Sequence, residues 1–151
     1  MKHFLRTAAI AALTIATLTA AADQQQRFRM LGHTSQGVVM ATEATGPQNA
    51  RKLQTIIAAA TPALPGEADN AEVGIIIDCV ANTAAINGLV TYLGNEEKIR
   101  TDAGTEQTPI NAGSPNELVA AMACGKPIPG PVVWIDGSVK ARAYALAEAK
   151  K

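Results

Sequence analysis

Short runs of apolar residues, bounded by turn-forming residues, predict a chain dominated by β-strands. The clearest run covers residues 72–80, which are rich in valine and isoleucine. This run is too short for a typical helix and therefore predicts a central strand. Further strands are predicted at 27–31, 37–42, 84–93, 98–101 and 132–135. Gly94-Asn95 predicts a tight hairpin turn, so the middle of the chain is expected to form an antiparallel meander.

Residues 46–60 fit two structures. Their apolar residues include Leu53, Ile56 and Ile57 at helical spacing, and Pro47 suits a first helical turn. Leu53, Thr55 and Ile57 also alternate as residues of a strand do. The spacing slightly favours a helix here. By contrast, the Pro- and Gly-containing stretch 61–70 predicts a loop.

A short helix is predicted from Ser114 to Cys124. Ser114 and Glu117 match a capping box, in which the Ser114 hydroxyl accepts from the amide of Glu117 and the Glu117 carboxylate accepts from the amide of Ser114. Pro115 suits the first helical position, and Gly125 suits a left-handed helix end. Further on, Ser138 is a candidate cap for an alanine-rich helix that reaches residues 150–151.

The first 22 residues match an export signal. They begin with basic residues, continue with an apolar run over residues 7–18, and end with Ala20 and Ala22 at the spacing of a cleavage site. We therefore expect cleavage after Ala22 and a single exported domain at 23–151, with a C-terminal extension from about residue 126. No later run is long enough to span a membrane. The expected location is the periplasm or the exterior of the cell.

Charge excludes one class of function. The whole chain has 13 basic and 13 acidic residues, and without Lys2 and Arg6 its formal net charge is about −2. The basic residues are scattered along the chain and form no stripe of the kind that nucleic acid requires. We therefore expect no nucleic-acid partner.

The two cysteines, Cys79 and Cys124, are expected to form one disulfide. An exported chain reaches an oxidising compartment, and two cysteines allow a single connectivity. Because the core has few aromatic residues, a crosslink closing a loop of about 45 residues should matter for stability.

The order of these motifs resembles a known family. A strand ending in Asp78-Cys79 is followed by a strand with Tyr92 before a turn, and then by Gly113-Ser114 leading into the helix that ends at Cys124. Over residues 37–125 this order resembles surface-adhesin protein E of Gram-negative bacteria. The resemblance implies an α+β fold in which a short helix is disulfide-linked to a twisted antiparallel sheet. It also implies a strand near residues 50–59.

Few residues are candidates for chemistry. His33 is the only histidine beyond the signal, so any Ser-His-Asp arrangement must use it. No histidine and cysteine cluster suits a zinc site, and we expect no metal, cofactor or catalytic residue. Asp78 lies in an apolar strand, Tyr92 belongs to the family pattern, and Trp134 lies between two apolar residues. These three are the candidate recognition residues.

The sequence therefore predicts a non-catalytic protein of the bacterial envelope that acts by binding, in the manner of an adhesin. Its partner would be another envelope protein or a host extracellular protein, such as those of the matrix or serum. Two alternatives remain open: a small periplasmic hydrolase that uses His33, and an inhibitor or accessory subunit that docks through Trp134. The oligomeric state is left open.

Overall fold

The computed structural model describes residues 26–102, 104 and 106–151, so the expected export signal lies outside the described residues. The chain is of the α+β class. Its elements are β1 (Arg27–Thr34), β2 (Gly37–Ala41), β3 (Arg51–Ala58), β4 (Asn70–Asp78), β5 (Thr83–Leu93), β6 (Glu96–Thr101), β7 (Thr108–Pro109), α2 (Pro115–Ala123), β8 (Trp134–Asp136) and α3 (Ser138–Ala149).

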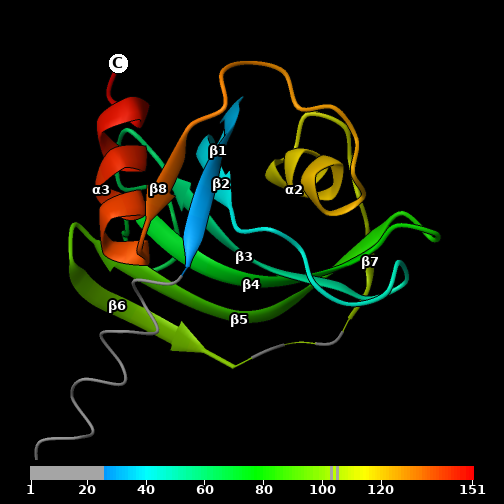
Figure 1. Ribbon diagram of the computed structural model, residues 1–151. Helices are drawn as coiled ribbons and strands as arrows, with labels where there is room; N and C mark the ends of the chain where they lie inside the picture. Colours follow the sequence, from blue (N-terminus) through cyan, green and yellow to red (C-terminus); the bar gives the residue numbers. More distant parts are fainter. Residues whose placement is uncertain (1–25, 103, 105) are drawn as a thin grey trace, which may run out of the picture.

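The strands form one antiparallel sheet in the order β6-β5-β4-β3-β2-β1-β8, with the short β7 also paired to β5 (Figure 1). Strands β1 to β6 are neighbours in the same order as in the sequence, which confirms the predicted meander. The turn at Gly94-Asn95 joins β5 and β6, and Gly94 has the positive φ of 59° that such a turn requires.

Residues 51–58 form a strand, so the helix favoured by the apolar spacing is wrong. Strand β3 pairs along its length with β4 and also pairs with β2. Its side chains point alternately to the two faces of the sheet, and both faces are covered. Leu53 therefore packs on one face and Ile56 on the other, and both are buried. Burial on both faces produced the spacing that resembled a helix.

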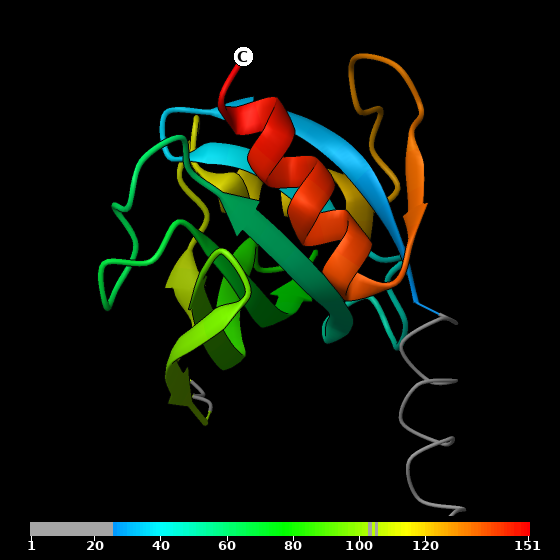
Figure 2. The ribbon, with the colours of Figure 1, turned by 90° about the vertical axis from the view of Figure 1, so that its left-hand side faces the viewer.

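Helices α2 and α3 lie on opposite faces of the sheet (Figure 2). Helix α2 packs on β1, β2 and β3, and α3 packs on β1 to β4 and β8. Alternate residues of β2 divide between the two cores, since Val39 faces α2 whereas Val38 and Met40 face α3. Each helix therefore covers its own hydrophobic core.

The predicted disulfide is present. It joins Cys79, directly after β4, to Cys124 at the end of α2, with 5.7 Å between their Cα atoms. Arg51 adds a second tie between sheet and helix, because its Nε donates to the carbonyl of Ala123 at 3.0 Å. The C-terminal end of α2 is thus fixed to the sheet.

The caps of α2 differ in part from the prediction. Ser114 is the N-cap residue, but its hydroxyl donates to the carbonyl of Asn111 at 2.6 Å and makes no cap bond to the helix. The Glu117 carboxylate accepts from the amide of Gly113 at 2.7 Å, one residue before the predicted donor. The reciprocal capping box is therefore wrong.

The C-terminal end of α2 agrees with the sequence. Gly125 has φ 69°, its amide donates to Met122, and the amide of Lys126 donates to Ala121. These two bonds form a Schellman motif, which satisfies carbonyls that the end of a helix leaves without partners.

The C-terminal segment belongs to the sheet. Strand β8 pairs with β1 over three residues, and α3 packs across the neighbouring strands. Ser138 is the first residue of α3 and Gly137 is its N-cap, so the predicted cap is one residue too late. Of the helices in the described ranges, none is long and apolar enough to cross a membrane.

Candidate functional site

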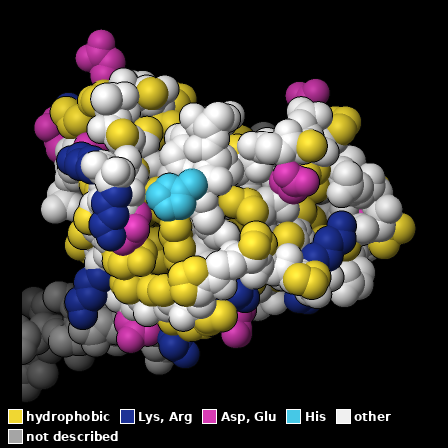
Figure 3. All heavy atoms as spheres, turned by 90° about the horizontal axis from the view of Figure 1, so that it is seen from above, with side chains coloured by type: hydrophobic (Ala, Val, Ile, Leu, Met, Phe, Trp, Pro, Cys, Tyr) yellow, Lys and Arg dark blue, Asp and Glu magenta, His cyan; other side chains and the backbone are white. Residues whose placement is uncertain are grey.

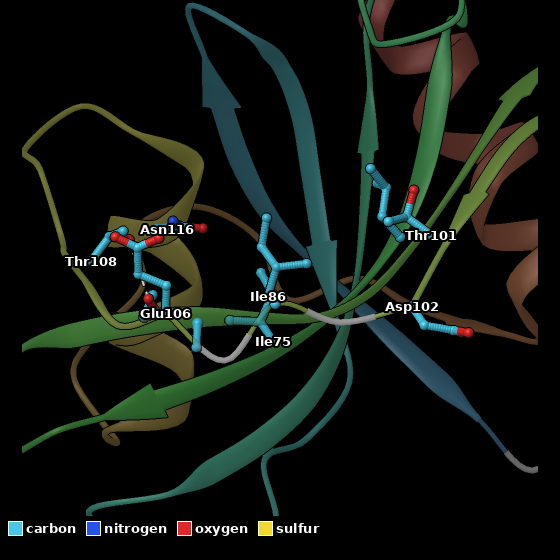
Figure 4. A pocket seen from close by; sticks show the side chains of 11 residues that line it. Ile75, Ile86, Thr101, Asp102, Glu106, Thr108 and Asn116 are labelled. Atoms are coloured by element: carbon cyan, nitrogen blue, oxygen red, sulfur yellow. Dashed lines mark hydrogen bonds between the residues drawn. The ribbon is translucent and has the colours of Figure 1, made fainter.

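A cavity of about 360 Å³ opens on the α2 side of the sheet, next to β4 and β5 (Figure 4). Its floor is apolar. The residues of the floor are Ile75, Ala84, Ala85, Ile86 and Leu89. Asp102, Gly104 and Glu106, which lie between β6 and β7, and Asn116 at the start of α2 line its walls. Its volume is at the lower end of the range for ligand pockets in proteins.

Most of this floor is buried, and Ile86 is its exposed part. Ile75 and Ile86 pair across β4 and β5, but only 3% of the Ile75 surface is exposed. The β4–β5 register shifts between Val73 and Ile75, and Gly88 has φ 110° at this irregularity. Ile86 is consequently 49% exposed, which is high for an isoleucine in the interior of a strand.

The rim of the cavity is polar and acidic. Asp102 follows the last residue of β6, and Glu106 precedes β7 by two residues. Strand β7 is fixed to β5 by its ladder and by the Thr108 hydroxyl, which donates to the carbonyl of Ala84 at 3.2 Å. Asn116, in the first turn of α2, completes the rim.

The two carboxylates lie at opposite ends of the cavity. In Figure 4, Glu106 lies beside Thr108 and Asn116, Asp102 lies at the other end, and Ile86 is between them. No lysine or arginine lines the cavity, and within the described ranges neither carboxylate forms an ion pair. The arrangement suits binding of a group with an apolar part and positive charge.

Asp78, the first candidate recognition residue, has a structural role. Its Oδ1 accepts from the amides of Val80 and Ala81, both at 2.8 Å. A carboxylate that accepts bonds from amides two and three residues later stabilises a tight turn. The apolar strand tolerates Asp78 because the turn satisfies its charge.

Tyr92, the second candidate, supports the docking of α3. The guanidinium of Arg142 lies 3.7 Å from the centre of the Tyr92 ring, and Arg142 Nε lies 3.1 Å from Glu72 Oε1. Burial, and next the Glu72 carboxylate, raise the pKa of the Tyr92 hydroxyl above its ordinary value. Arg142 is 5% exposed, so this cluster holds a buried charge between helix and sheet.

Trp134, the third candidate, lies in the edge strand β8 and is half-buried. Arg27 lies over its ring at 5.2 Å and forms an ion pair of 3.1 Å with Asp136. The tryptophan also lines a shallow hollow of about 290 Å³ together with Thr42 and Glu43.

The structure does not bring the three candidates together. Tyr92 pairs with Asn70, the first residue of β4, whereas Asp78 is the last residue of that strand. Eight residues along a strand span roughly 26 Å. Trp134 lies at the opposite edge of the sheet from β6. They cannot form one recognition site.

His33 is exposed near the end of β1, and Figure 3 shows the imidazole at the surface. It lines a groove of about 720 Å³ with Ser35 and Ala149. His33 also contributes to lowering the pKa of Glu148, after the larger effect of the Lys151 hydrogen bond.

A resident metal has no evident ligand set in the part of the chain that the structure describes. No group of three or more histidine, cysteine, aspartate or glutamate residues there could hold an ion.

Comparison with models of known families, with curated proteins and with solved structures gave no match to this chain. The resemblance to surface-adhesin protein E therefore rests on the sequence motifs alone.

Sequence reasoning missed the residues that form the cavity. In the sequence, Ile86 resembles an ordinary strand residue and Asp102 resembles a residue of a solvent-exposed turn. Nothing in the sequence singles out Glu106 or Asn116. They meet only because β5 pairs with both β6 and β7 at different points. The pairing of one strand edge with two different strands depends on segments that are separate in the chain, so local sequence patterns do not reveal it.

Proposed function

We propose that this chain is an exported, non-catalytic protein of the bacterial envelope that acts by binding another protein, in the manner of an adhesin. The observation that carries the proposal is the cavity over β4 and β5, with an apolar floor and an acidic rim. The export signal, the disulfide and the resemblance support an extracytoplasmic location, and the periplasm and the cell exterior both fit.

The cavity supports binding on energetic grounds. Ile86 keeps about half of its surface in water, and burial of that half would stabilise a complex by about 0.8–1.5 kcal/mol. The rim supplies charges with no partner in the described structure, which give orientation to a ligand. An occupied cavity would therefore gain both hydrophobic and electrostatic stabilisation.

A second candidate, an inhibitor or accessory subunit of an envelope protein, has one observation in its favour. Half-buried Trp134 lies in an edge strand, and nearby Val132 is 63% exposed. Tryptophan at such a position is enriched among residues that dominate interfaces. Loss of binding in Trp134→Ala with full binding in an Ile86 variant would favour this candidate.

The test compares two matched substitutions in the oxidised protein. Ile86→Ser removes the exposed apolar side chain of the cavity, and Val80→Ser removes one that is 79% exposed in the turn after β4. Binding to a panel of purified extracellular-matrix and serum proteins is measured by interferometry. We expect a panel member whose affinity falls about tenfold with Ile86→Ser and stays unchanged with Val80→Ser.

Equal binding by both variants would overturn the cavity as the binding site. The absence of any panel partner would overturn the adhesin-like role. A turnover activity abolished by His33→Ala would instead support the hydrolase alternative.

A further inference from the structure

We propose that Asn87 is a site of spontaneous deamidation that the fold leaves unprotected. The amide nitrogen of Gly88 attacks the side-chain carbon Cγ of Asn87 and closes a cyclic imide. The new bond from nitrogen to Cγ replaces the bond to the side-chain nitrogen, which leaves as ammonia together with the proton of the Gly88 amide. Water then opens the imide and yields aspartate or isoaspartate. Water is the only co-reactant, so the modification needs no enzyme.

The sequence offers two positions for this chemistry. Glycine has no β-carbon to hinder the attack of its nitrogen, so asparagine followed by glycine is especially reactive. The chain contains one such pair, Asn87-Gly88. It also contains one aspartate followed by glycine, Asp136-Gly137, which forms the same imide with loss of water. The structure treats the two pairs differently.

The backbone at Asn87 lies outside the regular pairing of β5. In the ladder with β4, the register passes from Ile86 directly to Leu89, so residues 87 and 88 have no partner residue in it. The ladders of β5 with β6 and β7 also omit both residues. Gly88 has φ 110°, which departs from an extended strand. An irregular backbone of this kind can turn the Gly88 nitrogen towards the neighbouring side chain.

The surroundings of Asn87 leave room for ring closure and for water. Asn87 is exposed and lines a polar hollow of about 300 Å³ together with Gln54 and Arg100. A β-carbon on Gly88 would have no heavy atom of the described residues within 4 Å, apart from those of its chain neighbours. Imide formation therefore meets no steric barrier on this side of the strand.

The pair Asp136-Gly137 is protected. Gly137 is buried, and its amide donates to the carbonyl of Gln26 at 2.7 Å. Asp136 pairs with Arg27 in the ladder between β8 and β1, and its carboxylate forms an ion pair of 3.1 Å with the same residue. The Gly137 nitrogen cannot turn towards the side chain of residue 136 without breaking its hydrogen bond.

The products change the charge of the hollow and the path of the backbone. Either product places a new carboxylate in a hollow that Glu72 and Asp102 already line. Isoaspartate also adds one carbon to the main chain, at a point where the backbone is tightly packed. A β-carbon on Gly74 would lie only 2.4 Å from the carbonyl oxygen of Asn87. We therefore expect the isoaspartate form to be less stable than the aspartate form.

The experiment follows modification of the oxidised, folded protein at neutral pH by peptide mass spectrometry. It uses the variant Asp136→Asn, in which asparagine precedes glycine at both positions. In the folded variant, position 87 should react at least tenfold faster than position 136, a difference of about 1.4 kcal/mol in activation free energy. In the same variant, reduced and unfolded in urea, the two positions should react at similar rates.

Substitutions at the site test the two reacting groups. Asn87→Gln should abolish the modification, because the longer side chain would have to close a less favourable ring. Gly88→Ala should slow it about tenfold in the unfolded chain, where backbone strain at this position has no influence. Asn95→Gln is the matched control, since Asn95 is also exposed but precedes a glutamate. It should leave the rate at position 87 unchanged.

The stability of the products is measured on chromatographically separated forms. The isoaspartate form of the aged protein should have a lower Tm than the variant Asn87→Asp, which carries the same charge without the extra carbon. Equal Tm values would overturn the expected strain at the backbone.

Two outcomes would overturn the proposal itself. If Asn87 stays intact in the folded protein but reacts in the unfolded one, β5 protects it after all. If both positions of Asp136→Asn react at the same rate in the folded protein, the fold does not select between them. None of these measurements depends on a binding partner, so they leave the proposed function to its own test.

Discussion

The two faces of the sheet hold their helices by different means. On one face, α2 contributes Val119, Ala120 and Ala123 to a core with large aliphatic residues from the strands, and a disulfide fixes its end. On the other face, α3 contributes the buried Ala141 and Ala145 to a smaller core, with Tyr144, Leu146 and Ala149 partly buried against it and Arg142 buried beside it.

This difference follows from what each helix can bury. The fully buried apolar residues of α3 are alanines, which have little apolar surface, and its larger apolar side chains, Tyr144 and Leu146, are only partly buried. The ion pair of Arg142 with Glu72 and the contact of its guanidinium with Tyr92 supply specific orientation instead. One face therefore depends on a covalent link, and the other depends on charge.

The largest effect is expected from removal of the covalent link. The double variant Cys79→Ser with Cys124→Ser opens a loop with a sequence separation of 45 residues, which should lower the free energy of unfolding by about 4 kcal/mol. Urea unfolding of the variant and of the oxidised wild type measures the loss. Hydrogen exchange should show faster exchange in α2 than in α3. A loss below about 1 kcal/mol, or α3 opening before α2, would contradict the comparison.

A smaller effect is expected from breaking the ion pair on the other face. Glu72→Gln leaves the Arg142 guanidinium buried without its anion, and it should cost about 2–3 kcal/mol. The value is at the low end for buried pairs because the Glu72 side chain is 27% exposed. Thermal or urea unfolding measures it.

The matched control replaces both partners. Glu72→Met with Arg142→Met removes the buried charge altogether and should recover most of the loss. Glu97→Gln, which breaks the exposed ion pair with Arg100, should have a much smaller effect. A double variant as unstable as Glu72→Gln would show that packing of the Arg142 side chain, and not its charge, holds α3.

The smallest effect concerns pH. The folded state raises the pKa of Tyr92, chiefly by burial and next by the Glu72 carboxylate, so the folded protein retains this proton to higher pH than the unfolded chain. The corresponding stability is present below about pH 10 and is lost as the pH rises through the folded pKa. Tyr92→Phe should reduce this loss. Equal pH dependence above pH 10 in both proteins would exclude Tyr92 as its source.

The difference between the two faces of the sheet also concerns the proposed site. On the face of α2, which has nine residues and is fixed at its C-terminal end, Ile86 of β5 stays 49% exposed. Helix α3 extends over part of β4 on the opposite face, where Glu72 pairs with Arg142. The covalently fixed face is thus the one that carries the exposed Ile86 of the cavity.

Local signals in the sequence explain which elements could be predicted. The valine- and isoleucine-rich run that became β4, the Gly94 turn and the Gly125 helix end depend on the intrinsic preferences of a few neighbouring residues. The capping box at Ser114 failed at the level of single bonds, because the Glu117 carboxylate reaches Gly113 when the preceding loop brings that amide close. Residue type predicted the helix start, and loop geometry decided the bonds.

Other features depend on residues far apart in the chain. The apolar pattern of residues 51–58 fits both a helix and a strand, and the structure decides for a strand that is buried on both faces. The same limit applies to the candidate site, in which Ile86, Asp102, Glu106 and Asn116 meet through strand pairing and the placement of α2.

The sequence by itself determined that this chain builds an antiparallel meander, where its hairpin and its first described helix occur, and that its two cysteines pair. These properties follow from local backbone preferences and from the single pairing that two cysteines allow. Only the tertiary structure decided between helix and strand for β3, buried Arg142 against Glu72, and left Ile86 half-exposed in a cavity lined by two carboxylates. Burial and electrostatic environment depend on which distant segments cover a residue, and the local pattern does not contain that information.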